Sequence, residues 1–179
     1  MFKTIALITV ATLVAVYLII WSLNSFGWDN PFLAFLINWL TLSWAAVVGQ
    51  GVTFVLPSTY YDIKTFERTG QVYERLGIRL FKRLVRRGPL SVFNPGLRFP
   101  KEKTIPALQH LDREMKKAET AHLYIFLLML VFSAYTLFRA GLVSMSWMLG
   151  FNILINGYPI MLQRYNRIKL QGLIEKLST

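Results

Sequence analysis

Residues 113–122, REMKKAETAH, mark the point at which a charged stretch runs into a long apolar segment. In a helix, Glu114, Ala118 and His122 lie on one line at i, i+4 and i+8, and Glu119 lies one turn before His122. The small side chain of Ala118 leaves space along this line. The stretch therefore places groups that can transfer protons at the mouth of a predicted membrane span.

The composition is that of an integral membrane protein. The chain has 179 residues, 54% of them hydrophobic, and a mean hydropathy of +0.43, which is too apolar for an ordinary soluble domain. Four segments are near the length that a helix needs to cross the hydrocarbon core: residues 5–23, 32–56, 121–138 and 142–162. We predict a single integral membrane domain, residues 1–179. The chain has no cysteine, which excludes thiol catalysis, disulfides and thiolate metal sites.

Charge predicts the topology. The net charge is +11, and every Lys and Arg except Arg139 lies at Lys3, in residues 57–119 or from Arg164 onward. The positive-inside rule makes these parts cytoplasmic, with both termini inside. The predicted fold is all-α, with four transmembrane helices as two hairpins joined by a basic cytoplasmic insert, residues 57–120. Basic segments beside spans favour membrane lipid over nucleic acid as the partner of a multi-pass membrane protein.

The insert contains a predicted amphipathic helix at residues 71–87. Its apolar residues repeat at helical spacing, and its basic residues lie on the other side of the helix. This pattern is typical of a helix in the membrane interface with its basic face toward anionic headgroups. It either anchors the insert or gathers the phosphates of an acyl donor. Gly and Pro residues between 88 and 106 predict a loop, and a new helix should begin near Thr104 or Pro106. On that helix Asp112 and Lys116 have the i, i+4 spacing of an ordinary ion pair. The apolar set is Tyr73, Leu76, Leu80, Phe81 and Leu84, and the basic set is Arg75, Arg79, Lys82, Arg83 and Arg86.

The fourth predicted span carries a polar stripe. Asn152, Asn156, Gln163 and Arg167 lie at offsets 0, 4, 11 and 15 and so share one helix face. Polar side chains within a span must face the protein interior. Gly157 and Pro159 should loosen or kink this helix just before Gln163.

Together these groups have the parts of an acyl-transfer site. His122 is the predicted general base, with Glu119 or Glu114 orienting its ring. Candidate donors to the oxyanion are Asn156, Gln163, Arg164 and Asn166. One alternative is that Glu and His only satisfy each other at the interface. Another is metal, because Glu119-x-x-His122 has the spacing of di-iron helices; a second Glu-x-x-His is absent from the sequence, so no metal is predicted.

Three motifs resemble the glycosyl-4,4'-diaponeurosporenoate acyltransferase family. They are Phe66-Glu67-x-x-Gly70 followed by Tyr73, Glu114-x-Lys116-Lys117-Ala118-Glu119-x-x-His122, and Gln163-Arg164-Tyr165-Asn166-Arg167. The resemblance implies transfer of a fatty acyl group to the sugar 6-hydroxyl of a glycosylated carotenoid or related glycolipid. It also implies a bacterial plasma-membrane location, and a thioester of coenzyme A or acyl carrier protein as co-substrate, without a further cofactor. It carries over Glu67, Glu114, Glu119, His122 and residues 163–167 as matching positions, with Glu67, Tyr165 and Arg167 among the predicted substrate-binding residues.

Two other classes of function remain open on the sequence. A non-catalytic membrane module would bind lipid or a partner protein through the basic insert, and an acyltransferase of the same kind could use another lipid acceptor. A transporter is disfavoured by four short spans with sparse intramembrane charge.

Overall fold

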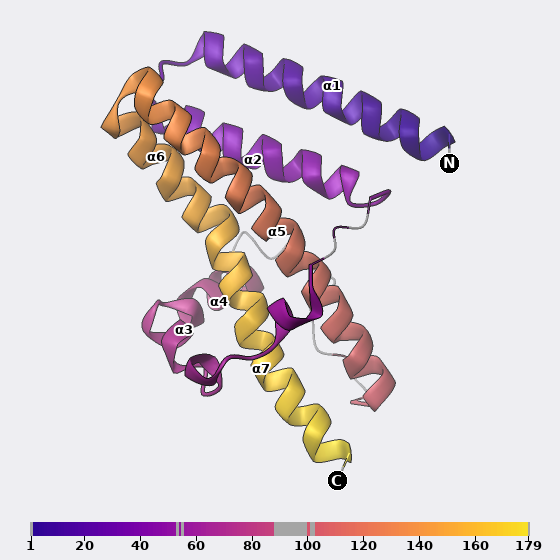
Figure 1. Ribbon diagram of the computed structural model, residues 1–179. Helices are drawn as coiled ribbons and strands as arrows, with labels where there is room; N and C mark the ends of the chain where they lie inside the picture. The colour runs from indigo at the N-terminus through magenta and orange to yellow at the C-terminus, as the bar shows by residue number, and fades with distance from the viewer. Residues whose placement is uncertain (1, 53, 55, 88–99, 101–102, 179) are drawn as a thin grey trace. The chain divides into compact units, whose positions relative to one another are not determined.

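The computed structural model describes residues 2–52, 54, 56–87, 100 and 103–178, and the regular secondary structure of these residues is entirely helical (Figure 1). The all-α prediction is confirmed. The chain forms two compact units: a first unit of Met1–Val55 and Ala121–Gly157, and a second of Leu56–Thr120 and Tyr158–Thr179. The long helix α5, Ile105–Ala140, contributes residues to both. The single-domain organisation stays a prediction.

Three helices within the described residues are long and apolar enough to cross a membrane: α1 (Phe2–Ser25), α2 (Pro31–Val48) and α5. They correspond to the first three predicted spans. The fourth, residues 142–162, is divided among α6 (Leu142–Asn152), the π-helical segment η5 (Ile153–Gly157) and the start of α7 (Tyr158–Ser178). The four-span arrangement as two hairpins therefore stays a prediction.

Local sequence sets both ends of α2. Asn30 caps its first turn by accepting from the Phe32 amide at 2.9 Å, and Pro31 occupies the first helical position. The helix ends at Val48, so the predicted extension to residue 56 is wrong. A turn follows at residues 49–51, where Gly51 lies so close to α1 that a Cβ would collide with Thr4.

The core of the first unit joins three helices. Because α2, α5 and α6 each supply apolar side chains to it, these helices are held by packing of Leu, Ile, Ala and Met rather than by charge. Asn38 adds a hydrogen bond between α2 and α6, because its Nδ2 donates to the Met148 carbonyl at 3.3 Å. The buried core residues are Leu33, Ala34, Ile37, Ala45, Ile125, Met129 and Met148.

The π-helical segment lies where the sequence predicted a loosened helix. Pro159 lacks the N–H that would donate to Ile155 in an α-helix, so the preceding turn must change its hydrogen bonding. The structure makes this change over Ile153–Gly157. Single π-helical turns of this kind occur frequently at functional sites.

In the second unit, two short 3-10 helices, η1 (Ser58–Tyr61) and η2 (Thr65–Glu67), precede α3 (Gln71–Arg75) and α4 (Ile78–Arg87). The prediction of one helix over residues 71–87 is wrong, because Gly77 takes a φ of 80° and breaks it in two. Most of the loop predicted from residue 88 to 106 lies outside the described residues. Helix α5 begins at Ile105, as predicted.

The insert packs onto α7. Tyr73, Ile78 and Phe81 form a cluster with Leu162 and Tyr165 of α7. A further cluster joins the start of α5 to the end of α7 and consists of Leu108, Leu111, Met115 and Leu170. The other apolar residues of the amphipathic pattern, Leu76, Leu80 and Leu84, are exposed at 51%, 60% and 46%. Leu80 and Leu84 therefore form an exposed apolar face on α4 that does not take part in the packing against α7.

Gly70 is the position where the insert depends most on glycine. Its φ is 72°, and an added Cβ would lie 3.0 Å from the Tyr165 ring. We expect Gly70→Ala to destabilise the protein by about 1–3 kcal/mol, through left-handed strain and displacement of Tyr165. Gly172→Ala is the matched control, because nothing lies within 4 Å of its added Cβ in α7. Thermal unfolding of the purified variants in detergent measures both, and equal melting temperatures would contradict this role for Gly70.

Candidate active site

Two arginines of α7 organise the second unit. Arg164 makes a bidentate pair with Glu67, with Nε 3.0 Å from Oε2 and Nη2 2.5 Å from Oε1. Its Nη1 also donates to Glu119 Oε1 at 3.0 Å. Arg167 donates from Nη1 to the other oxygen of Glu119 at 2.9 Å. The Glu119 carboxylate is therefore shared between two guanidinium groups three residues apart on one helix.

The series of charges continues along α5. Arg167 Nε donates to Asp112 Oδ1 at 3.3 Å, and Lys116 Nζ lies 2.7 Å from Asp112 Oδ2. The second of these is the i, i+4 pair that the sequence predicted. The whole set alternates in sign, and we call it the charge network: Glu67, Arg164, Glu119, Arg167, Asp112 and Lys116. Glu67, Glu119 and Arg167 are each 1% exposed or less, which charged groups tolerate when they are paired and hydrogen-bonded.

Glu67 is held in its ionised form. Burial by itself would raise its pKa, but hydrogen bonds from Arg164, from the Tyr73 hydroxyl and from the Lys64 amide lower the pKa to about 2. Burial and the hydrogen bond to Glu67 raise the pKa of Tyr73 to about 12. Glu67 is thus a permanent anion near neutral pH and has no proton to give.

The arginines also fix the backbone of the segment that leads into the insert. Arg164 donates to the carbonyls of Tyr60 and Asp62, each at 3.2 Å, and Arg167 donates to the Tyr61 carbonyl at 2.5 Å. Each guanidinium lies over a tyrosine ring, with its central carbon 5.4 Å from the Tyr60 centroid or 5.3 Å from the Tyr61 centroid. The charge network therefore determines the conformation of residues 60–62.

The other members of the 163–167 run also have defined surroundings. The Tyr165 hydroxyl donates to Glu74 at 2.6 Å, and Lys82 donates to the Asn166 side-chain oxygen at 2.6 Å. Gln163 is buried, and its Oε1 has no hydrogen-bond partner among the described residues. A buried acceptor in this state is costly and calls for an explanation.

His122 lies in the first unit and belongs to a series of side-chain amides. Its Nδ1 is 3.2 Å from Asn156 Oδ1. Asn156 Nδ2 donates to Asn152 Oδ1 at 3.0 Å, and Asn152 Nδ2 donates to the Phe126 carbonyl at 3.0 Å. We call this series, from the Phe126 carbonyl through Asn152 and Asn156 to His122, the amide relay. Asn152 and Asn156 are completely buried, as the polar stripe predicted.

The structure distributes the predicted site residues differently from the sequence pattern. The described hydrogen bonds of Glu119 go to Arg164 and Arg167 rather than to an imidazole. Glu114 pairs with Lys117 at 2.7 Å, and its side chain is 38% exposed. Asn156, predicted as an oxyanion donor, uses its amide nitrogen on Asn152. The i, i+4 spacing of Asn152 and Asn156 was visible in the sequence, but their bonding to α5 was not.

Sequence reasoning also missed that Asp112 accepts from Arg167. The i, i+4 spacing of Asp112 to Lys116 accounts only for its other partner. No group of three or more His, Asp and Glu side chains suited to a metal ion occurs in the part of the chain that the structure describes.

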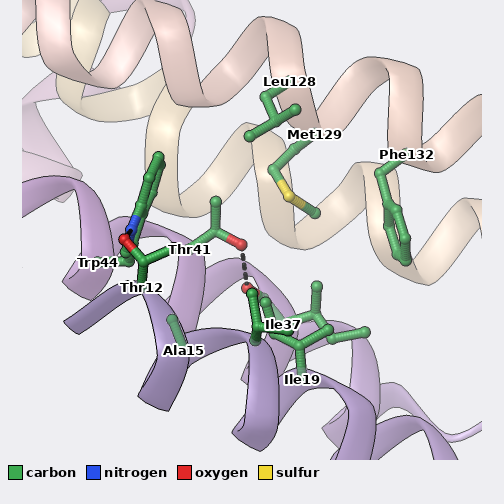
Figure 2. A pocket seen from close by; sticks show the side chains of 10 residues that line it. Thr12, Ala15, Ile19, Ile37, Thr41, Trp44, Leu128, Met129 and Phe132 are labelled. Atoms are coloured by element: carbon green, nitrogen blue, oxygen red, sulfur yellow. Dashed lines mark hydrogen bonds between the residues drawn. The ribbon is translucent and has the colours of Figure 1, made fainter. Parts of the chain in front are cut away.

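The first unit contains an apolar groove of about 240 Å³ between α1, α2 and α5. Figure 2 shows side chains of all three helices facing this space, with the Thr41 hydroxyl turned back to the Ile37 carbonyl. Trp44 donates to the Thr12 hydroxyl at 3.0 Å, which satisfies the polar groups at the wall. The lining residues are Thr12, Ala15, Val16, Ile19, Ile37, Thr41, Trp44, Leu128, Met129 and Phe132.

Because of the charge network, the free energy of unfolding should decrease as the pH falls into the acid range. The pKa of Glu67 falls from 4.5 to about 2 in the fold, so its contribution, up to about 3 kcal/mol, is complete above pH 4.5 and is lost as the pH falls toward 2. We expect Glu67→Gln to lower the melting temperature at pH 6, and the difference from wild type to shrink below pH 4.5. The exposed pair member Glu114 supplies the control Glu114→Gln, whose effect should stay below about 1 kcal/mol. A pH-independent difference for Glu67→Gln would contradict the ionised pair.

The family comparison covers the residues that build both the charge network and the amide relay. The family model described as glycosyl-4,4'-diaponeurosporenoate acyltransferase matches residues 57–176, about two thirds of the chain. No curated protein and no solved structure matches the sequence. The match begins at Pro57, after α1 and α2, and includes every predicted site residue from Glu67 to Arg167. The chain therefore belongs to the glycosyl-4,4'-diaponeurosporenoate acyltransferase family.

Proposed function

We propose that the protein transfers a fatty acyl group from a cytosolic thioester to a sugar hydroxyl of a glycosylated carotenoid held in the membrane. The family match over residues 57–176 is the observation that carries this proposal. The three long apolar helices fit an enzyme whose acceptor is a membrane lipid. The acyl donor is a thioester of coenzyme A or acyl carrier protein, and no further cofactor takes part.

His122 is the proposed general base. Among the predicted catalytic groups, Glu119 is committed to two arginines and Glu114 to Lys117, whereas an imidazole bonded through Nδ1 can use Nε2 in the reaction. Nε2 takes the proton of the sugar hydroxyl as that oxygen attacks the thioester carbonyl carbon. The tetrahedral intermediate then expels the thiolate with cleavage of the C–S bond. The thiolate takes the proton from the imidazolium, which gives the ester, a thiol and the neutral ring.

The residues of the 163–167 run have distinct proposed roles. Arg164 and Arg167 hold the carboxylates and the backbone of residues 60–62, and so they maintain the shape of the second unit. Gln163 is the proposed substrate contact, because its buried Oε1 requires a donor that the described residues do not supply. A hydroxyl of the acceptor is such a donor.

Replacement of His122 tests the catalytic proposal. Purified protein in detergent, given a glycosylated carotenoid acid and an acyl thioester, should yield a product heavier by one acyl group on mass spectrometry. We expect His122→Ala to lower turnover by about 100-fold or more, the contribution that a general base makes. His110→Ala is the matched control, since His110 is exposed on the same helix. Full activity of His122→Ala would remove the base assignment, and acylation of a different glycolipid alone would replace the acceptor.

The exposed face of α4 supports the interfacial location that the sequence predicted. Leu80 and Leu84 lie one turn apart and are exposed, and Arg79 and Arg83 are exposed beside them. Leucine beside arginine on one helix suits the boundary between acyl chains and anionic headgroups. We therefore place α4 at the membrane surface in the proposed arrangement.

Because the chain has no cysteine, a single introduced thiol can report on this location. We expect a polarity-sensitive fluorophore on Leu80→Cys to be quenched by brominated lipid in anionic proteoliposomes. The same label on Arg83→Cys should be quenched less. Equal, weak quenching at both positions would place α4 in water.

A further inference from the structure

The amide relay has a fixed polarity because it ends on a backbone carbonyl. The Phe126 oxygen can only accept a hydrogen bond, so the group of Asn152 that faces it at 3.0 Å must be the NH₂. The oxygen of Asn152 then faces Asn156 and accepts from its NH₂ at 3.0 Å. Each amide orientation follows from the one before it, and none can reverse alone without opposing two donors or two acceptors.

The same logic extends to the imidazole. The NH₂ of Asn156 donates to Asn152, so the Asn156 side-chain oxygen is the atom that lies 3.2 Å from His122 Nδ1. An amide oxygen only accepts, and Nδ1 must therefore carry a proton. In a neutral imidazole the other nitrogen then carries the lone pair.

The amide relay is buried, and burial raises the free-energy cost of reversing any of its hydrogen bonds. Asn152 and Asn156 have no exposed surface, so water does not compensate a reversed amide. Phe126 and His122 are one turn apart on α5, and Asn152 and Asn156 are four residues apart across the end of α6 and η5. Two pairs at matching helical spacing allow one ladder of hydrogen bonds to join them.

We propose that Asn152 is a positioning residue that acts through Asn156 to keep His122 as the Nδ1–H tautomer, with Nε2 as the basic nitrogen. This inference rests on the proposed function only for its catalytic consequence, because the tautomer is a property of the resting protein. Asn152 does not touch the imidazole. It sets the orientation of the amide that does.

Nitrogen-15 NMR of the histidine ring tests the proposal directly. A protonated ring nitrogen and one with a lone pair resonate in separate regions, and His110→Gln removes the signal of the other histidine. In full-length protein in detergent at a pH where His122 is neutral, we expect one tautomer with the proton on Nδ1. A wild-type spectrum with the proton on Nε2 would overturn the proposal whether or not any variant folds.

The informative variant is Asn152→Leu, which keeps the volume and removes both polar atoms. We expect its spectrum to show both tautomers, and its kcat to fall about 10-fold or more because the ring is no longer held in one state. Asn38→Leu is the matched control: Asn38 is also fully buried in the first unit, and its amide bonds Ala34 and Met148 instead. It should lose stability without changing the His122 tautomer.

The outcomes separate this proposal from the proposed function. An unchanged single tautomer in Asn152→Leu would overturn the positioning role. Mixed tautomers in Asn152→Leu, together with full activity of His122→Ala, would support the positioning role and remove the base assignment. Mixed tautomers with loss of activity in both variants would support both.

Discussion

The shared carboxylate of Glu119 is the interaction on which the second unit depends. Two guanidinium groups three residues apart on α7 meet its two oxygens, and each arginine reaches on to a second acid, Glu67 or Asp112. Removal of Arg164 would leave the buried Glu67 without a counter-charge, which costs more than the pair contributes. Arginine suits this role because its planar group offers five donors, and here they bind carboxylates and backbone carbonyls together.

This arrangement decides which groups are available for chemistry. A carboxylate that accepts from an arginine, a tyrosine and a backbone amide, as Glu67 does, is stabilised as an anion and is a poor base and a poor acid. Both oxygens of Glu119 accept from arginines. The first unit uses neutral groups instead: Asn156 bonds the imidazole, and Asn152 and a backbone carbonyl orient Asn156 in turn. Amides suit an apolar segment, because charge there carries a high desolvation cost. The continuous helix α5 carries both sets, with the charge network ending at Glu119 and the amide relay beginning at His122.

The sequence predicted those features that periodicity and composition control. The starts of α2 and α5, the three apolar helices, the Asp112–Lys116 pair and the burial of Asn152 and Asn156 all follow from local pattern. The break at Gly77 was missed because the apolar spacing runs through it while only its positive φ ends the helix. The partners of Glu119 were missed for a different reason. A contact 45 residues along the chain leaves no trace in local spacing, so the nearest histidine was taken as the partner.

An asparagine beside the proposed general base has a chemical consequence. It fixes the ring and its tautomer as a carboxylate does, but it does not stabilise the imidazolium with a negative charge. Such a base works best when the proton is held only briefly. The proposed thioester donor meets this condition, because its leaving thiolate has a conjugate acid of pKa about 8.5 and departs without strong acid assistance. The neutral relay and a thioester donor are therefore consistent with each other, whereas an amide or alkyl ester donor, with a far more basic leaving group, would require a better-stabilised imidazolium.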